Sequence, residues 1–317
     1  MSFEVILPFL RPIAHLIQDP DIAEVMVNAS RRVFIERQGS LEEVPGIMLD
    51  ERNLKVAVKN IARALGEDVS EERPILDSRL PDGSRVAAVF PPCSVGGTTL
   101  TIRKFQTHFF TGEELVRIGT LTQGLLEQLG AIIGGRQNIL ISGGTSTGKT
   151  TLLNALSAYI PDTERIVVIE DTAELQIDKP NLVRFEARRA QADLPAVSIR
   201  DLLRATLRHR PDRVVLGEVR GGEAFDLVQA LNTGHGGTLS TIHANSAPQA
   251  LARLASCVMQ SGIELSYQAV RQQIGDSIHF VLHLERSHGR RTVTEFLRIE
   301  RYDAHIDKYE TDLVKDW

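Results

Sequence analysis

The sequence predicts an α/β protein of two domains, in which a smaller α+β domain precedes a parallel β-sheet covered by helices. Three observations support this prediction. The 317 residues suggest roughly two domains. From about residue 121, short apolar runs alternate with helical patterns, as in a parallel sheet. A glycine-rich segment at residues 142–151 joins one such run to a helix. We therefore expect an N-terminal domain over 1–110, a linker over 111–120 and a second domain over 121–317.

The composition describes an ordinary globular chain. Hydrophobic residues make up 42% of it, and its formal net charge is −5, so no basic field draws it to nucleic acid. We expect no sequence-specific nucleic acid binding. No apolar run approaches the roughly 18 residues of a membrane span. Cys93 and Cys257 form no CxxC pair, which supports neither a zinc site nor a disulfide framework. A cytoplasmic location is the expectation.

The first domain combines turn signals with helical periodicity. Apolar residues recur at helical spacing over 51–65, and Gly66 is placed to cap that helix. Two short polar segments separate β-rich runs and predict hairpins. In chain order we expect an opening helix near 7–17 interrupted by Pro8 and Pro12, strands at 24–27 and 32–36, the helix at 51–65, strands at 78–80 and 85–90, and a last strand at 98–103.

The second domain shows strands of buried character separated by helices. Ser198, followed three residues later by Asp201, is close to a capping box. The β-rich runs at 279–284 and 291–299 belong to a tail whose placement the sequence does not predict. The expected elements are strands at 138–141, 165–169, 213–216 and 238–242, and helices at 150–156, 199–209 and 222–232.

The segment at 142–151 fits the phosphate-binding pattern G-x-x-x-x-G-K-[ST], with Gly143, Gly148, Lys149 and Thr150 at the specified positions. Glycines let the backbone wrap a polyphosphate, and amides at a helix start point at the anion. Lys149 is expected on the outer phosphates, and the Thr150 hydroxyl on Mg²⁺. The alternative is a glycine-rich turn that holds a lysine by chance, which the strand–loop–helix context disfavours.

Acidic residues follow two of the expected strands, where ligands of open α/β sheets bind. Glu218 follows the strand at 213–216, and Glu170, Asp171 and Glu174 follow the strand at 165–169. A carboxylate there can orient an attacking water or hold Mg²⁺. Glu218 is the strongest candidate, with a surface carboxylate as the alternative. At least one of the other three is expected to be an ordinary solvated charge.

Two histidines flank the strand at 238–242. His243 follows its carboxyl end and is the better candidate for sensing a terminal phosphate, whereas His235 precedes it. A structural role remains open for both, because a lone histidine is more often structural than catalytic.

Five motifs in this order give the chain a family resemblance. It resembles the type II/type IV secretion traffic ATPases, and in particular the conjugative and type IV secretion branch with its tight-adherence pilus relatives. The zinc-type cysteine motif of many type II secretion and pilus-assembly members is absent. The motifs are Gly-Gly-Thr-Ser-Thr-Gly-Lys-Thr-Thr, Ile-Glu-Asp-Thr-Ala-Glu-Leu, Gly-Glu-Val-Arg-Gly-Gly-Glu-Ala, Thr-Gly-His-Gly-Gly and Thr-Ile-His-Ala-Asn, joined in the first domain by Leu-Pro-Asp-Gly-Ser-Arg-Val and Leu-Thr-Ile-Arg-Lys-Phe.

The resemblance implies a RecA-like P-loop NTPase domain and homo-hexameric rings that bind ATP and Mg²⁺ between the domains. It makes Glu218 the catalytic glutamate and Glu174 the functional acidic-box residue, with Gly217 in place of the usual strand-end Asp, a departure that the family shares. His235 and His243 fall in its histidine box. Arg85 and Arg103 become candidates for closing on the phosphates. The implied nucleotide-binding residues are Gly143, Gly144, Thr145, Ser146, Thr147, Gly148, Lys149, Thr150 and Thr151, with Thr150 also at the metal.

The favoured interpretation is an ATP-hydrolysing motor for conjugative transfer or type IV secretion, in contact with inner-membrane components of the machine. A motor for type IV or tight-adherence pili is the alternative within the family. A GTPase should carry an N-K-x-D motif, which is absent, and a small-molecule kinase needs no large preceding domain. An assembly protein that binds ATP without turnover is disfavoured because Lys149 and Glu218 are both present.

Overall fold

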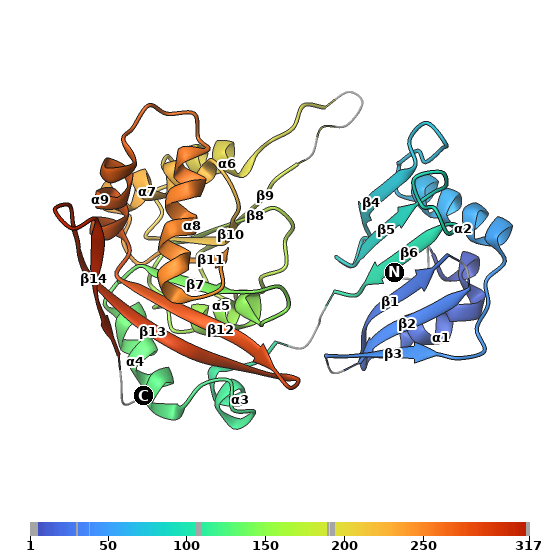
Figure 1. The fold of residues 1–317 in the computed structure, drawn as a ribbon, viewed down its shortest axis with the longest axis horizontal. Helices are drawn as coiled ribbons and strands as arrows, with labels where there is room; N and C mark the ends of the chain where they lie inside the picture. Colours follow the sequence, from blue (N-terminus) through green and yellow to red (C-terminus); the bar gives the residue numbers. More distant parts are fainter. Residues whose placement is uncertain are drawn as a thin grey trace. The chain divides into compact units, whose positions relative to one another are not determined.

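The computed structural model divides the chain into two compact units, residues 1–108 and 109–317. Each unit has its own β-sheet and its own hydrophobic core, and each is described here by itself (Figure 1). The structure describes residues 6–29, 31–37, 39–105, 109–188, 190 and 194–314.

The first unit is a six-stranded antiparallel sheet with the order β3-β2-β1-β6-β5-β4. The helix α2 places Leu54, Val58 and Ile61 in the core of this unit. Asp50 caps that helix by accepting a hydrogen bond from the Asn53 amide at 3.0 Å. The elements are η2 (Leu7–Phe9), η3 (Arg11–Ile13), α1 (Ala14–Gln18), β1 (Ile22–Asn28), β2 (Arg32–Arg37), β3 (Ser40–Val44), α2 (Glu51–Ala64), β4 (Ile75–Arg79), β5 (Arg85–Val89) and β6 (Thr99–Arg103).

Both predicted hairpins of this unit are confirmed, as β1–β2 and β4–β5, and so are the helix and the last strand. The opening helix is reduced to two 3₁₀ turns and a five-residue α1, because Pro8 and Pro12 occupy the start of each turn. Strand β3 was not predicted. Its residues are polar and largely exposed, so its sequence lacks the alternation that marks a half-buried strand.

The second unit is built on an eight-stranded sheet with the order β14-β13-β12-β7-β11-β10-β8-β9. The six strands from β12 to β9 run parallel, and β13 and β14 extend this sheet as antiparallel strands. The tail thus completes the sheet. The strands are β7 (Ile139–Gly143), β8 (Ile166–Glu170), β9 (Leu182–Glu186), β10 (Arg213–Val219), β11 (Leu239–His243), β12 (Phe280–Ser287), β13 (Arg290–Asp303) and β14 (Lys308–Leu313).

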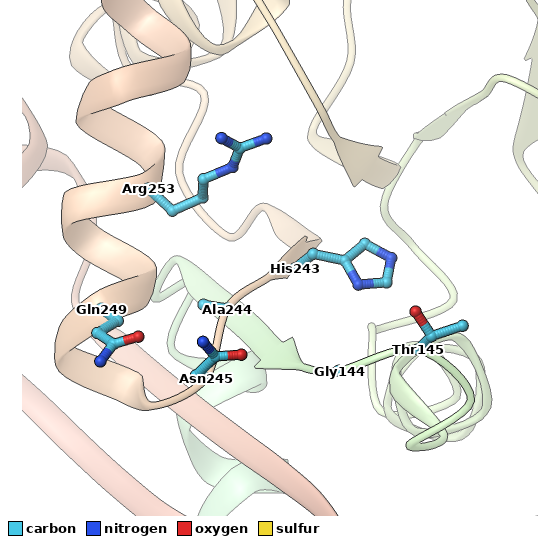
Figure 2. A pocket seen from close by; sticks show the side chains of 7 residues that line it. All are labelled: Gly144, Thr145, His243, Ala244, Asn245, Gln249 and Arg253. Atoms are coloured by element: carbon cyan, nitrogen blue, oxygen red, sulfur yellow. The ribbon is translucent and has the colours of Figure 1, made fainter.

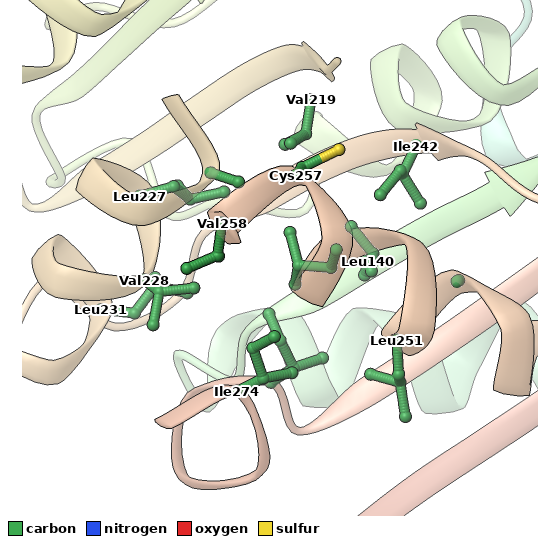
Figure 3. Packing of buried hydrophobic residues seen from close by; sticks show 14 of the residues in the cluster. Leu140, Val219, Leu227, Val228, Leu231, Ile242, Leu251, Cys257, Val258 and Ile274 are labelled. Carbon is green, nitrogen blue, oxygen red and sulfur yellow. The ribbon is translucent and has the colours of Figure 1, made fainter. Parts of the chain in front are cut away.

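Helices cover both faces of this sheet, which explains the continuous apolar character of its parallel strands. Successive strand residues point to opposite faces: Leu140 packs in the core under α6 to α9, while Ile139 and Ile141 pack in the core under α3 to α5. Figure 3 shows part of the first of these cores. The helices are α3 (Gly112–Arg117), α4 (Gln123–Gly134), α5 (Lys149–Ser157), α6 (Ile199–Thr206), α7 (Glu223–Asn232), α8 (Ala247–Met259) and α9 (Tyr267–Ser277).

The stretch 111–120, expected to be a linker, contains α3. This helix starts with a capping box between Thr111 and Glu114, and it contacts α4 and α5. Leu115 is buried in the core of the second unit. Residues 112–117 therefore belong structurally to the second unit.

Among the described helices, none is long and apolar enough to cross a membrane.

Candidate nucleotide-binding site

The glycine-rich loop lies between the buried strand β7 and the helix α5. Gly148 caps α5 in a left-handed conformation (φ +95°), which glycine adopts without steric cost. A Cβ at Gly143 would lie 2.6 Å from the carbonyl oxygen of Leu284. Both glycines are therefore required by the backbone itself. The result is a loop that exposes amides at the start of α5, the arrangement that binds phosphate.

Lys149, the first residue of α5, is only 7% exposed and lies within this loop. Its Nζ donates hydrogen bonds to the carbonyl oxygens of Gly144 at 2.6 Å and Gly143 at 3.1 Å. Burial lowers the pKa of Lys149, and the charge of Glu218 partly offsets this shift. Because burial disfavours the ammonium, an anion in the loop would stabilise it.

Three predicted site residues form a chain of contacts across the ends of β10 and β11. Lys149 Nζ lies 3.5 Å from His243 Nδ1, and His243 Nε2 lies 3.1 Å from Glu218 Oε1. Burial lowers the pKa of His243, and the charge of Lys149 lowers it further. The imidazole is therefore neutral at neutral pH. Because an ammonium can only donate, we assign Nδ1 as the acceptor and Nε2–H as the donor to Glu218.

Arg220 connects Glu218 with the acidic box. Its Nη2 lies 3.0 Å from Glu218 Oε2, and its Nη1 lies 3.3 Å from Asp171 Oδ2. The hydrogen bond to Glu218 is the main reason that the pKa of Arg220 is raised, and the charges of Asp171 and Glu174 raise it further. The structure therefore places Arg220 beside the carboxylates of Glu218 and Asp171, within the electrostatic influence of Glu174.

Glu170 is the carboxylate whose role the sequence missed. It is 3% exposed, and its Oε1 accepts hydrogen bonds from the amides of Glu174 and Leu175, both at 2.8 Å. Its Oε2 is buried without a hydrogen-bond partner, 3.6 Å from Arg184 Nη2. Burial raises the pKa of Glu170. Glu170 thus holds the loop that carries Glu174, which is itself half-buried.

His235 does not join this group within the chain. His235 precedes β11, whereas His243 is its last residue. The two histidines therefore lie at opposite ends of this strand. His235 Nδ1 lies 3.2 Å from the carbonyl oxygen of Ala230, at the end of α7. Within the chain, His235 therefore contacts the carboxyl-terminal end of α7 and not the other candidate site residues.

The remaining loop residues occupy three kinds of position. Thr147 is buried and donates to the carbonyl oxygen of Gly144 at 3.0 Å. Thr145 and Ser146 are exposed at the tip of the loop, while Thr150 and Thr151 are half-buried in the first turn of α5. The Thr150 hydroxyl makes no hydrogen bond within the described part of the chain.

Arg85 and Arg103 lie in the first unit, directly opposite each other on β5 and β6. Arg79 is the next partner beyond Arg85, and Glu24 is the partner of Arg103 on β1. Cross-strand partners share a face, so three arginines form a row there. Like charges in such positions repel. The row continues through Glu24 to Glu36. Burial raises the pKa of Glu24 and the charge of Arg103 lowers it, so a carboxylate already lies beside Arg103. The sequence did not reveal this juxtaposition.

A further arginine touches the loop from the tail. Arg291, at the start of β13, donates from Nε to the carbonyl oxygen of Ser146 at 3.0 Å. Its Cδ would lie 3.3 Å from a Cβ placed on Gly148. No sequence signal marked this residue, because the placement of the tail beside β7 was not predictable.

A polar pocket of about 420 Å³ opens beside the loop. Figure 2 shows Gln249 and Arg253 on α8 at one side, Thr145 at the other and His243 between them. Gly144, Ala244 and Asn245 complete the lining. Among the described residues, including those that line this pocket, no group of three or more His, Cys, Asp or Glu side chains could hold a metal ion.

Residues 10–311 match the profile of the family described as "Type II/IV secretion system protein". The chain belongs to this family. It is 38% identical over 301 residues to the conjugal transfer protein TrbB of Rhizobium radiobacter, covering 93% of this chain and 88% of the relative. It is 31% identical to the type IV secretion system protein VirB11 of Bartonella henselae, covering 92% of each chain.

The fold has a counterpart among solved structures. The structure of the ATPase DotB of Legionella pneumophila matches 95% of this chain and 83% of its own, with a TM-score of 0.65 at 19% identity. The predicted family and the RecA-like P-loop fold are confirmed. The chain is an ATP-hydrolysing enzyme of the secretion family, as the motifs predicted.

Proposed function

We propose that the chain is the hexameric ATPase of a conjugative transfer or type IV secretion machine, and that it couples ATP hydrolysis to movement between its two units. The observation that carries the catalytic part is the chain of contacts Lys149–His243–Glu218. It links the residue that binds the outer phosphates to the carboxylate that would act on water.

In this proposal Glu218 orients the attacking water and accepts its proton. The neutral His243 donates its Nε2–H to Glu218, which fixes the carboxylate and links it to Lys149. Lys149 and the amides at the start of α5 bind the phosphates. Glu174 lies on the loop held by Glu170, near Arg220, and adds negative charge beside the same strand ends.

The residues present suit Mg²⁺, which binds oxygen ligands and takes many of them from phosphates and waters. The Thr150 hydroxyl makes no hydrogen bond within the described residues. Glu218 is connected through His243 to Lys149, the residue before Thr150. When bound, Mg²⁺ would neutralise charge on the transferring phosphate.

Arg85 and Arg103 lie on a different unit from Lys149, and they are direct cross-strand partners, so both could contact one phosphate. We propose that they close on the nucleotide at a subunit boundary, where His235 of the histidine box also contributes. The partners would be copies of this chain and inner-membrane components of the machine, with the protein on the cytoplasmic side and peripheral to the membrane.

The test of the catalytic part is steady-state phosphate release with Mg²⁺, together with nucleotide titration. Lys149→Ala should lose both binding and turnover. Glu218→Gln should keep its ATP affinity and lose about 10²–10⁴-fold in kcat, because an amide holds position without accepting a proton. Equal loss of affinity and turnover in Glu218→Gln would assign Glu218 to binding instead.

The choice of machine needs a different experiment. Deleting the gene and scoring plasmid transfer, protein secretion and surface pili separates the proposal from the pilus-motor alternative. Loss of pili alone would favour that alternative. Light scattering of the purified protein with nucleotide tests the ring, and a protein that stays monomeric while turning over ATP would contradict it.

A further inference from the structure

The pocket beside the phosphate loop contains an arginine that the proposed mechanism does not use. Arg253 is exposed on α8 and, within the described residues, makes no hydrogen bond or ion pair. Other arginines around the nucleotide sheet are held by carboxylates: Arg220 by Glu218, and Arg200 by Asp226. A cation without a partner in a polar pocket is available for an anionic ligand.

The pocket lining has the chemistry of an anion site. Its polar side chains are those of Thr145, Asn245, Gln249 and Arg253, which can donate hydrogen bonds to an anion, and His243, whose N–H is directed at Glu218. None of the described residues that line it is acidic. Gln249 and Arg253 are four residues apart on α8, so they share one face of that helix. The pocket volume of about 420 Å³ suffices for a phosphoryl group and its waters.

The position of the pocket identifies the anion. One wall is Gly144 and Thr145 of the phosphate loop, and His243, another wall, lies 3.5 Å from Lys149 Nζ. A polyphosphate bound by Lys149 therefore has its outer end toward this pocket. The charge of Arg253 is also close enough to lower the pKa of His243. Arg253 and the catalytic histidine thus face the same space (Figure 2).

We propose that Arg253, with Gln249 beside it, binds the terminal phosphate of ATP from α8 of the same subunit and so distinguishes ATP from ADP. This inference rests on the proposed ATPase function. It adds the positive charge of Arg253 to those of Lys149 and of the arginines Arg85 and Arg103. Arg253 would contact the phosphate before hydrolysis and lose that contact when the phosphate leaves. Because α8 follows β11 directly, this contact would connect the nucleotide state to the helical layer of the second unit.

The test compares nucleotide affinities of the full chain in the presence of Mg²⁺. The probes are ADP and the slowly hydrolysed imido analogue of ATP. Arg253→Ala should weaken binding of the analogue about tenfold or more, the usual effect of losing a charged hydrogen bond, and leave ADP affinity unchanged. Arg253→Lys should recover part of the loss, because lysine keeps the charge without the planar fork. In turnover assays Arg253→Ala should also lower kcat.

The matched control is Arg298→Ala, which removes an exposed arginine of the same unit that pairs with Glu300 on β13. It should change neither affinity. Equal loss of analogue and ADP affinity in Arg253→Ala would overturn the proposal, since the arginine would then act on a shared part of the nucleotide or on the fold. If Arg253→Ala changes neither the ADP nor the analogue affinity and alters kcat only under conditions in which rings assemble, the proposal is also overturned. Arg253 would then pair with an acidic group on a neighbouring copy of the chain. A wild-type protein without turnover would instead refute the ATPase function.

Discussion

Replacing Glu170 by alanine removes the acceptor that holds the beginning of the acidic-box loop. Two amides, those of Glu174 and Leu175, donate to Glu170 Oε1 at 2.8 Å, and Leu175 is 1% exposed. A buried donor left without an acceptor costs about 1–3 kcal/mol. For the two amides together we expect about 2–4 kcal/mol, because the half-buried Glu174 gives its amide some access to water. This corresponds to roughly 30- to several-hundred-fold easier opening of the loop.

Hydrogen exchange of the full chain, followed by mass spectrometry on a peptide that covers residues 170–176, measures this opening directly. The matched control is Glu170→Gln, which keeps an acceptor for both amides and places its NH₂ where Oε2 now lies without a hydrogen bond. We expect exchange in Glu170→Gln to stay within a few-fold of wild type. The reasoning is refuted if the alanine variant exchanges as slowly as the glutamine variant.

The same pair of variants tests the ionisation of Glu170. Burial raises its folded-state pKa above the ordinary value of 4.5, so the folded state holds the proton more tightly than the unfolded state. This contribution to the free energy of unfolding is present at low pH and is lost as the pH rises from 4.5 through the raised pKa. Glu170→Gln should therefore flatten the pH dependence of urea unfolding in that window. An unchanged slope would mean that another group titrates.

Three more substitutions test the site. His243→Ala should lower kcat less than Glu218→Gln does. In the wild-type protein, turnover should decrease on acidification only below pH 6.5, the ordinary pKa of histidine, because burial and the charge of Lys149 lower the pKa of His243. Arg291→Ala should raise the Kd of ATP several-fold by loosening Ser146, whereas the exposed neighbour Arg290→Ala should not, as titration calorimetry can show. Arg103→Ala should cost about 10³–10⁵-fold in kcat and leave its unit folded, because the side chain is exposed. Mixing this variant with Lys149→Ala should restore turnover if the arginine acts across subunits. Unrestored turnover in assembled rings would place the arginine within one subunit.

Most of the fold followed from local patterns. Strands β7, β8, β10 and β11 are short apolar runs, and the motif at their ends predicted the phosphate loop. The hairpins were marked by turn residues. The exposed strand β3 and the tail were not predictable, because the first lacks alternation and the second depends on pairing with β7, more than a hundred residues earlier. Arg291 reaches the loop through that pairing alone.

In the candidate site, too, local patterns predicted individual residues, whereas contacts between distant segments were not predictable. The sequence identified Lys149, Glu218 and His243 one by one, because each follows a strand or opens a helix. Their contacts depend on β11 lying between β7 and β10, so that His243 is opposite Gly143 in the parallel register. The order of strands in a sheet is a property of the whole domain. The sequence placed all three residues near the carboxyl ends of the strands, but no local pattern could predict the direct contacts of His243 with Lys149 and Glu218.

Gly217 illustrates how one strand can determine the residue on another. In the sequence it stood where an aspartate is usual. In the structure a Cβ at Gly217 would lie 3.1 Å from Glu170 Cγ, so a side chain there would require Glu170 to shift by a few tenths of an ångström. Glu170 in turn holds the amides of the acidic-box loop. The absence of a side chain at Gly217 on β10 thus leaves room for the buried side chain of Glu170 on β8. From this buried position at the end of β8, Glu170 fixes the loop that carries Glu174.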